Sequence, residues 1–263
     1  MIEINKLVKK NNKGINRKIM AIGGGEILKT DLSRETRPID KEIIRMSGHR
    51  HPRVLFIPTA SHDAVGYCNN MLEYFGIELG CDVEFLLLYS DIDIEKIRTK
   101  INSAEIIYVG GGNTYAMMRR WRALGIDDML YKAYSNGTTM SGLSAGAICW
   151  FRYGASDSRK LRSPDANMIK VTGLGFINAV FCPHFDSEPH REDFLKELMR
   201  KTKGPAIAVD DCCAIEIIDD KYKIISSVES ANSYKVFWKN EIYHKEIIAK
   251  NRELKELGEL ISI

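Results

Sequence analysis

The sequence has no apolar run long enough to cross a bilayer, since the longest, such as VLFI and FLLL, fall far short of the roughly 20 residues required. The opening stretch, MIEINKLVKKNNKG, is polar and lacks the apolar segment of an export signal. The six cysteines form no C-x-x-C pair and no spacing typical of a zinc site. We therefore expect a cytoplasmic protein with reduced thiols, no membrane anchor, no metal and no organic cofactor.

The sequence also lacks a large excess of one charge. It has 38 Lys and Arg residues and 35 Asp and Glu residues, which give a formal net charge of +3. The charges are dispersed and form no basic stripe with interleaved aromatic residues, so we do not expect a nucleic-acid partner. No repeat or low-complexity linker breaks the chain, and 44% apolar residues suffice for a sizeable core. We predict a single domain over residues 1–263, in which residues 32–52, charged and containing Pro38 and Pro52, are a possible irregular insertion.

Short β-rich runs alternate with longer amphipathic stretches, which is typical of crossover units that feed a parallel sheet. Helices are expected over residues 66–79, 127–134 and 188–201, over DIEKIRTKINSA and SAGAICWF, and after a cap at Asn113 or Thr114. The last residues are expected to form a surface helix or a tail. We predict an α/β fold with a mostly parallel sheet flanked by helices, and with antiparallel strands in the C-terminal part at CAIEIID, YKIISSV and YKVFWK. The other expected strands are KIMAIGGG, RVLFIPTAS, VEFLLLY, EIIYVGGG, GTTMSGL, AVFCPHF and AIAVD.

Residues 142–146, GLSAG, fit G-x-S-x-G, the nucleophile elbow in which a serine projects from a sharp strand-to-helix turn. Small neighbours suit such a turn because bulkier side chains would collide with adjacent strands. A second interpretation is an ordinary tight turn in which Ser144 only caps a helix. The pentapeptide alone leaves both open.

Three glycines end another expected strand in VGGGNTYAM, where exposed N–H groups can point at an anion or a developing oxyanion. Gly111 or Gly112, with the N–H of Ala145, would make an oxyanion hole. We also expect Gly111, Asn113 and Thr114 to contact the substrate. A phosphate-binding turn or simple steric clearance remains an alternative, and the glycines at 23–25 are equally ambiguous.

A serine nucleophile needs a base, and His184 is the best placed of six histidines because FCPHFD follows an apolar strand. Asp157, in a loop shortly after the nucleophile helix, is the acid we favour to accept a hydrogen bond from the Nδ1–H of His184. Asp186 and Glu188 are local rivals for that role.

Taken in order, the motifs FIPTAS, GGGNTYAM, GLSAGAICWF, SDS and PHFDSEP resemble the dipeptidase E (aspartyl dipeptidase) and cyanophycinase family of serine peptidases. The resemblance implies a flattened α/β sandwich similar to class I glutamine amidotransferases. It also implies that Ser144 is the nucleophile, His184 the base, and Gly112 with Ala145 the oxyanion donors. Family members place an acid close to Asp157, and Arg191 is a plausible counterpart of the arginine with which dipeptidase E holds a substrate carboxylate.

We therefore predict a serine peptidase that hydrolyses small peptides, in the first instance dipeptides, through an acyl-enzyme on Ser144, with a possible aspartyl preference. An esterase of the α/β-hydrolase kind is a weaker alternative, because only 40 residues separate Ser144 from His184. A catalytically silent sensor of small peptides or metabolites is the alternative from another class. Both a monomer and a homodimer fit the sequence.

Overall fold

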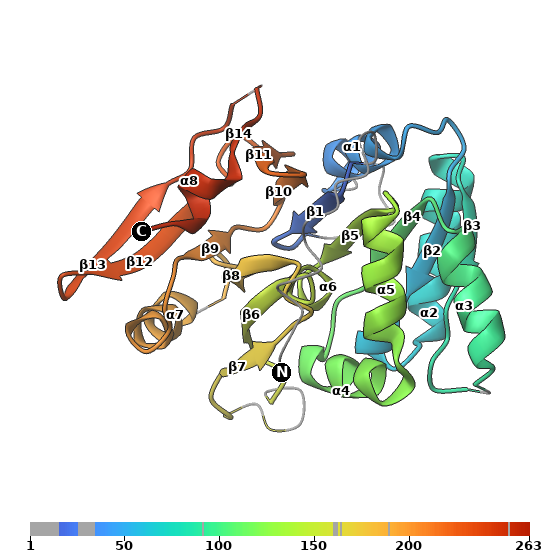
Figure 1. The fold of residues 1–263 in the computed structure, drawn as a ribbon, viewed down its shortest axis with the longest axis horizontal. Coiled ribbons are helices and arrows are strands. Elements are labelled where there is room, and N and C mark those ends of the chain that lie inside the picture. Colours follow the sequence, from blue (N-terminus) through green and yellow to red (C-terminus); the bar gives the residue numbers. More distant parts are fainter. Residues whose placement is uncertain are drawn as a thin grey trace.

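The computed structural model contains two β-sheets and a set of helices that cover their faces (Figure 1). The predicted α/β class is confirmed. No helix in the part of the chain that the structure describes combines the length and apolar character needed to cross a membrane. The structure describes residues 16–25, 35–90, 92–159, 163, 165–188, 190–251 and 253–263.

The first sheet is the mostly parallel one that the alternating pattern predicts. Five of its strands run parallel in the order β1-β5-β4-β2-β3, and three antiparallel strands extend it beyond β1 in the order β10-β11-β14. The strands are β1 (Lys18–Ile22), β2 (Arg53–Ile57), β3 (Asp82–Phe85), β4 (Ile106–Val109), β5 (Thr139–Leu143), β10 (Cys213–Ile218), β11 (Lys221–Ser226) and β14 (Lys255–Glu256).

A second, six-stranded sheet lies beside the first and was not expected from the sequence (Figure 1). Its three central strands, β6, β8 and β9, run parallel, so their carboxyl ends meet at one edge. Antiparallel partners complete it on both sides. The strands are β6 (Phe151–Ser156), β7 (Ile169–Thr172), β8 (Ile177–Cys182), β9 (Ala206–Val209), β12 (Ser233–Lys239) and β13 (Ile242–Ile247).

Alternation along β1 and β2 explains how the layers pack, since successive side chains point to opposite faces of a sheet. Met20 and Phe56 face a core shared with α1, α2 and η3, whereas Ile19 and Leu55 face α3, α4, α5 and the second sheet. Helix α7 covers the far face of the second sheet. The helices are α1 (Arg37–Ser47), η2 (Thr59–Ser61, 3-10), α2 (Val65–Met71), η3 (Leu72–Glu78, a π-helix), α3 (Ile94–Ser103), α4 (Thr114–Leu124), α5 (Ile126–Ser135), α6 (Ala145–Ile148), α7 (Arg191–Arg200) and α8 (Leu257–Ile261).

Most of the interval 32–52 is not an irregular insertion, because residues 37–47 form α1. Residues 32–34 lie outside the described residues. Pro38 lies in the first turn of the helix, where its missing N–H costs nothing. Ile39 and Ile43 recur four residues apart and are fully buried against the sheet. Lys41 and Arg45 lie on the outer face of this amphipathic helix, whereas Asp40 is fully buried and accepts hydrogen bonds from Thr36 and Tyr74.

The helix expected over SAGAICWF is also wrong beyond its first turn. Helix α6 ends at Ile148, and strand β6 begins at Phe151. The β-branched and aromatic side chains that follow Ala147 are buried in the contact between the two sheets, and this tertiary packing overrides a short local preference.

One charged cluster is built into the first sheet. Glu216 on β10 is fully buried and lies opposite Lys223 on β11, with Oε2 and Nζ 3.1 Å apart. Lys223 also contacts Glu42 at 2.9 Å, and Arg45 stands 3.8 Å from Glu216. Burial, together with the neighbouring Glu42, raises the pKa of Glu216 to about 7. Lys223 therefore compensates a carboxylate that has almost no access to water.

Replacing Lys223 by Met should destabilise the fold by about 3 kcal/mol at pH 8, because breaking a buried ion pair leaves an uncompensated charge. The pKa of Glu216 is raised on folding, so its contribution to stability is lost as pH rises through about 7. The penalty should therefore shrink at pH 5, where Glu216 is protonated. Urea unfolding at both pH values measures this. Lys221→Met, which removes an exposed 3.9 Å pair with Glu256, should cost under about 0.5 kcal/mol; equal losses at both lysines would contradict the assignment.

Candidate active site

Ser144 occupies the sharp turn between β5 and α6, with φ 55° and ψ −112°. A positive φ is uncommon for a residue with a side chain and costs free energy. The Ser144 hydroxyl does not cap α6; instead, its Oγ lies 2.8 Å from Nε2 of His184. The geometry favours the nucleophile interpretation over the helix cap.

The glycines of the GLSAG turn are required by close backbone packing. A methyl group on Gly142 would lie 2.3 Å from the carbonyl oxygen of Gly146. A methyl group on Gly146 would lie 2.0 Å from the carbonyl oxygen of Val109. Only glycine at both positions lets the turn pass so close to β4, which is what fixes the direction of the Ser144 side chain.

His184 follows β8 and takes a left-handed conformation with φ 49°. Its N–H donates to the carbonyl oxygen of Gly23 at 3.2 Å, which ties it to the end of β1 in the other sheet. Its side chain is 21% exposed, so the imidazole is held by the protein and still reaches solvent. The predicted pairing of His184 with Ser144 is thus present in the structure.

The acid that contacts His184 is Asp211, whose Oδ1 lies 2.6 Å from Nδ1 of the imidazole. Asp211 follows β9, which is the parallel neighbour of β8. Parallel neighbours end at the same edge of a sheet, so the residues after β8 and β9 come together although they are 27 positions apart. A signal was present in the sequence, since the expected strand AIAVD ends in an aspartate and a second aspartate, Asp211, follows it directly.

Asp157, the acid expected from the sequence, does not take this place. It follows β6, on the other side of β8 from β9. The next residue, Ser158, accepts hydrogen bonds from the Tyr115 N–H and the Asn113 side chain, which tie the loop to the start of α4. Among the described residues, the Asp157 carboxylate has no hydrogen bond or ion pair, and we correct the prediction accordingly.

The two local rivals have other partners. Asp186 accepts a hydrogen bond from the backbone N–H of Asp211 at 2.9 Å and so orients the acid without touching the imidazole. Glu188 pairs with Arg191. The neighbouring Asp210 is turned away, because its side chain accepts from the N–H of Asn232 at 2.8 Å.

The electrostatics of Asp211 suit a carboxylate that stays ionised. Burial acts to raise the pKa of Asp211, but hydrogen bonds from His184 and Ser187 and the positive charge of Arg191 outweigh it and lower the pKa below its ordinary value. An ionised Asp211 accepts a hydrogen bond from the Nδ1–H of His184, which leaves Nε2 as the acceptor that faces Ser144.

The glycine turn after β4 passes beside the nucleophile, as the sequence predicts. A methyl group on Gly111 would lie 3.6 Å from Cβ of Ser144. Gly112 has φ 132° and presses against the carbonyl oxygen of Ala60, where a methyl group would lie at 2.4 Å. The N–H of Gly111 donates to the Tyr67 hydroxyl at 3.3 Å, whereas Gly112 is exposed.

Three residues expected to contact substrate serve the fold instead. Thr114 is 1% exposed and bonded to Ser156, and Asn113 caps α4 while donating to Ser158. Arg191 is 1% exposed and donates to Glu188 and to the carbonyl oxygen of Ala155. A guanidinium so enclosed has almost no surface that a substrate could reach, so this structure does not support the role predicted for Arg191.

The glycines at 23–25, ambiguous in the sequence, have a clear steric role. A methyl group on Gly24 would lie 1.9 Å from Oδ1 of Asp211 and 2.4 Å from Nδ1 of His184. These two atoms form the hydrogen bond between His184 and Asp211, so Gly24 packs directly against that bond. Gly23 approaches the carbonyl oxygen of Asp210 in the same way, at 2.2 Å from a methyl carbon.

Comparison with known proteins gives a consistent result. The model of Peptidase family S51 matches residues 19–225. The chain is 32% identical over 222 residues to the uncharacterized peptidase YgaJ of Bacillus subtilis strain 168, an alignment that spans 84% of this chain and 92% of that protein. It is 28% identical over 145 residues to the uncharacterized peptidase Lmo0363 of Listeria monocytogenes, spanning 53% and 68%.

Solved structures share the fold. A peptidase from an acI-B1 Actinobacterium superposes with a TM-score of 0.67 at 18% identity, covering 91% of this chain and 96% of that one. A putative peptidase E protein from Listeria monocytogenes EGD-e gives 0.60 at 19% identity, covering 80% and 98%. At such low identity these likenesses concern the architecture alone.

Asp211→Asn should slow the reaction of Ser144 with a fluorophosphonate by about 10³-fold or more. The amide would present a donor to His184 and favour the wrong tautomer, and comparable substitutions elsewhere cost about 10⁴-fold. Asp157→Asn is the matched control and should change the rate by less than about threefold. The assignment fails if Asp157→Asn is the slower of the two variants.

Gly24→Ala should reduce the same labelling rate by about 100-fold or more, since the new methyl group must push apart the hydrogen-bonded pair of His184 and Asp211. Gly258→Ala, at a helical position with open space around it, is the control for adding a methyl group. Circular dichroism and the melting temperature verify that both variants fold. A fully reactive Gly24→Ala protein would refute the steric role.

Proposed function

The chain belongs to peptidase family S51 and is a serine-type peptidase, and from this premise we propose that it hydrolyses small peptides, dipeptides among them, through an acyl-enzyme on Ser144. The observation that carries the proposal is the continuous hydrogen-bonded line from Ser144 Oγ through His184 to Asp211. Nucleophile, base and orienting acid in contact are what acyl transfer from an amide requires.

In the first half of the reaction, Nε2 of His184 takes the hydroxyl proton of Ser144 while Oγ attacks the carbonyl carbon of the peptide bond. The electrons of the carbonyl double bond move to oxygen, and the N–H groups of Gly112 and Ala145 donate to that oxyanion. The adduct then collapses, the C–N bond breaks, and the amine leaves with the proton that His184 had taken.

In the second half, water replaces the amine. His184 removes one proton from the water as its oxygen attacks the acyl ester, and the same oxyanion donors hold the second tetrahedral adduct. Collapse breaks the bond to Oγ, Ser144 recovers its proton from His184, and the acid product departs. Asp211 remains ionised throughout and stabilises the imidazolium that forms twice in the cycle.

The proposal that the substrates are small peptides rests on the resemblance to the family. A preference for N-terminal aspartate is not part of the proposal, because Arg191, the residue that would have supported it, is enclosed by Glu188 and the Ala155 carbonyl. The proposal includes a cytoplasmic location, which suits six buried and unpaired cysteines.

Labelling with a fluorophosphonate, mapped by mass spectrometry, followed by a panel of dipeptides tests the proposal. We expect an adduct on Ser144 in the wild type, none in Ser144→Ala, much slower labelling in His184→Ala, and hydrolysis of at least part of the panel. Turnover by Ser144→Ala should fall by about 10⁴-fold or more.

Two results would redirect the assignment. A folded wild type that neither labels nor cleaves any peptide, yet is thermally stabilised by one, would be a sensor. Efficient turnover of simple esters with no peptide cleavage would make the protein an esterase.

A further inference from the structure

A cavity of about 440 Å³ lies directly beyond the glycine turn after β4 (residues 110–112), at the start of α4. Its volume is in the range of small-molecule sites, which span about 300–1,000 Å³. Neither the triad nor the oxyanion donors form its walls. The residues that matter here are Asn113, Tyr115 and Arg119 on one side and Ser158 and Arg159 on the other.

The two sides of this cavity are tied together by buried hydrogen bonds. Ser158 is 4% exposed; its Oγ accepts from the Tyr115 N–H at 3.1 Å, and its carbonyl oxygen accepts from Asn113 Nδ2 at 3.2 Å. Ser156 Oγ lies 2.7 Å from Ser158 Oγ and extends the network. Arg119 and Arg159, which are carried by these two tied segments, therefore face a common, formed space.

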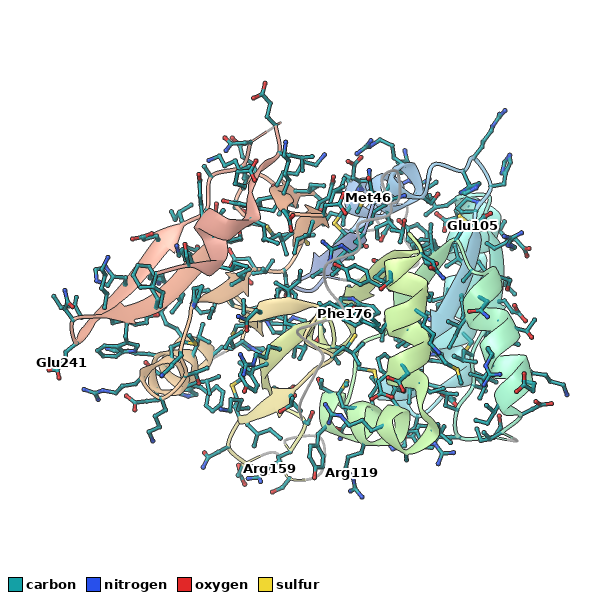
Figure 2. The ribbon with its side chains drawn as sticks, viewed as in Figure 1. Met46, Glu105, Arg119, Arg159, Phe176 and Glu241 are labelled. Atoms are coloured by element: carbon teal, nitrogen blue, oxygen red, sulfur yellow. The ribbon has the colours of Figure 1, made fainter. Side chains whose placement is uncertain are left out.

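Neither of these two guanidinium groups has a carboxylate partner among the described residues. Arg119 only approaches the ring of Tyr115, at 5.8 Å from its centroid. Figure 2 shows Arg119 and Arg159 close to the same edge of the molecule, and both line the cavity. Two like charges beside one cavity repel, and a bound anion would relieve that repulsion.

The cavity is also within reach of a peptide held at the nucleophile. Gly111 lies against Ser144, where a methyl group would stand 3.6 Å from the serine Cβ. Consecutive Cα atoms are about 3.8 Å apart, so Asn113 starts at most about 8 Å further on. A peptide advances by about 3.5 Å per residue. A carboxylate one or two residues from the scissile bond can therefore reach the Asn113 side of the cavity, which Arg119 and Arg159 also line.

We propose that this cavity is a carboxylate-binding subsite in which Arg119 and Arg159 hold a carboxylate of the peptide. The carboxylate is either the α-carboxylate of the C-terminus or that of an acidic side chain. Guanidinium groups suit it because they donate two parallel hydrogen bonds to a carboxylate. The ligand assignment rests on the proposed peptidase function, and it makes Arg119 and Arg159 determinants of specificity rather than of chemistry.

Binding to Ser144→Ala, measured by calorimetry, tests the subsite without turnover. Two pairs of probes separate the two sources of the carboxylate: alanyl-alanine against its C-terminal amide, and aspartyl-alanine against asparaginyl-alanine. We expect the carboxylate form of at least one pair to bind about tenfold more tightly or better. Adding Arg119→Gln or Arg159→Gln should abolish most of that difference.

Arg98→Gln is the matched control, because Arg98 is an exposed arginine of α3 that pairs with Glu95 on the same helix. It should preserve the discrimination within about twofold. In an otherwise wild-type chain, fluorophosphonate labelling, which needs no carboxylate, verifies that each arginine variant still activates Ser144.

The subsite is overturned if each carboxylate form binds no better than its amide, or if both arginine variants keep the full discrimination. Such a result leaves the peptidase proposal intact, because wild-type hydrolysis of the same peptides is measured separately. Conversely, failure of hydrolysis with preserved, arginine-dependent binding would remove the peptidase function and retain the subsite.

Discussion

The close approach of Gly23 and Gly24 to the ends of β8 and β9 is the constraint on which the rest of the site depends. A side chain at either glycine would collide with Asp210 or with the bond between His184 and Asp211. At this point the Gly23 carbonyl accepts from the N–H of His184, which comes from the second sheet, and the Ile22 carbonyl accepts from the N–H of Ser144, which comes from the first. The end of β1 thereby holds the backbones of both Ser144 and His184 in place.

The site is consequently assembled from two sheets. Ser144 and the glycine turn come from strands of the first sheet, β5 and β4, whereas His184 and Asp211 come from neighbouring parallel strands of the second. Neither sheet alone supplies all three residues of the hydrogen-bonded line from Ser144 through His184 to Asp211. The packing of the two sheets on a shared core thus matters for the site, since the 2.8 Å contact between Ser144 and His184 joins a residue from each sheet.

Local sequence patterns predict the parts of the site that a single turn determines. They fail where the position of a residue depends on which of two neighbouring strands it follows. The GLSAG turn and the strand-end histidine carry their own steric and positional signals, so Ser144 and His184 could be found from the sequence. Asp157 and Asp211 both follow strands that flank β8, and sequence does not tell to which side the imidazole turns. The arrangement of the strands in the second sheet determines which aspartate contacts His184. The periodicity of the sequence does not distinguish these strands from those of the first sheet. Arg191 illustrates the same limit, because its burial depends on Glu188 and on the carbonyl of Ala155 in β6.

Strand β6, which is not followed by the acid that contacts His184, leads instead into residues that line the cavity of the proposed subsite. The end of β6 is bonded to the start of α4 through Ser158, which draws Asp157 away from His184 and carries Arg159 toward Arg119. The parallel strands on either side of β8 therefore divide two tasks. The end of β9 leads to Asp211, which contacts His184, and the end of β6 leads to Arg159, which lines the cavity of the proposed carboxylate subsite. Because Asp211 already contacts His184, the loop after β6 can contribute to the proposed subsite without a role in orienting the imidazole.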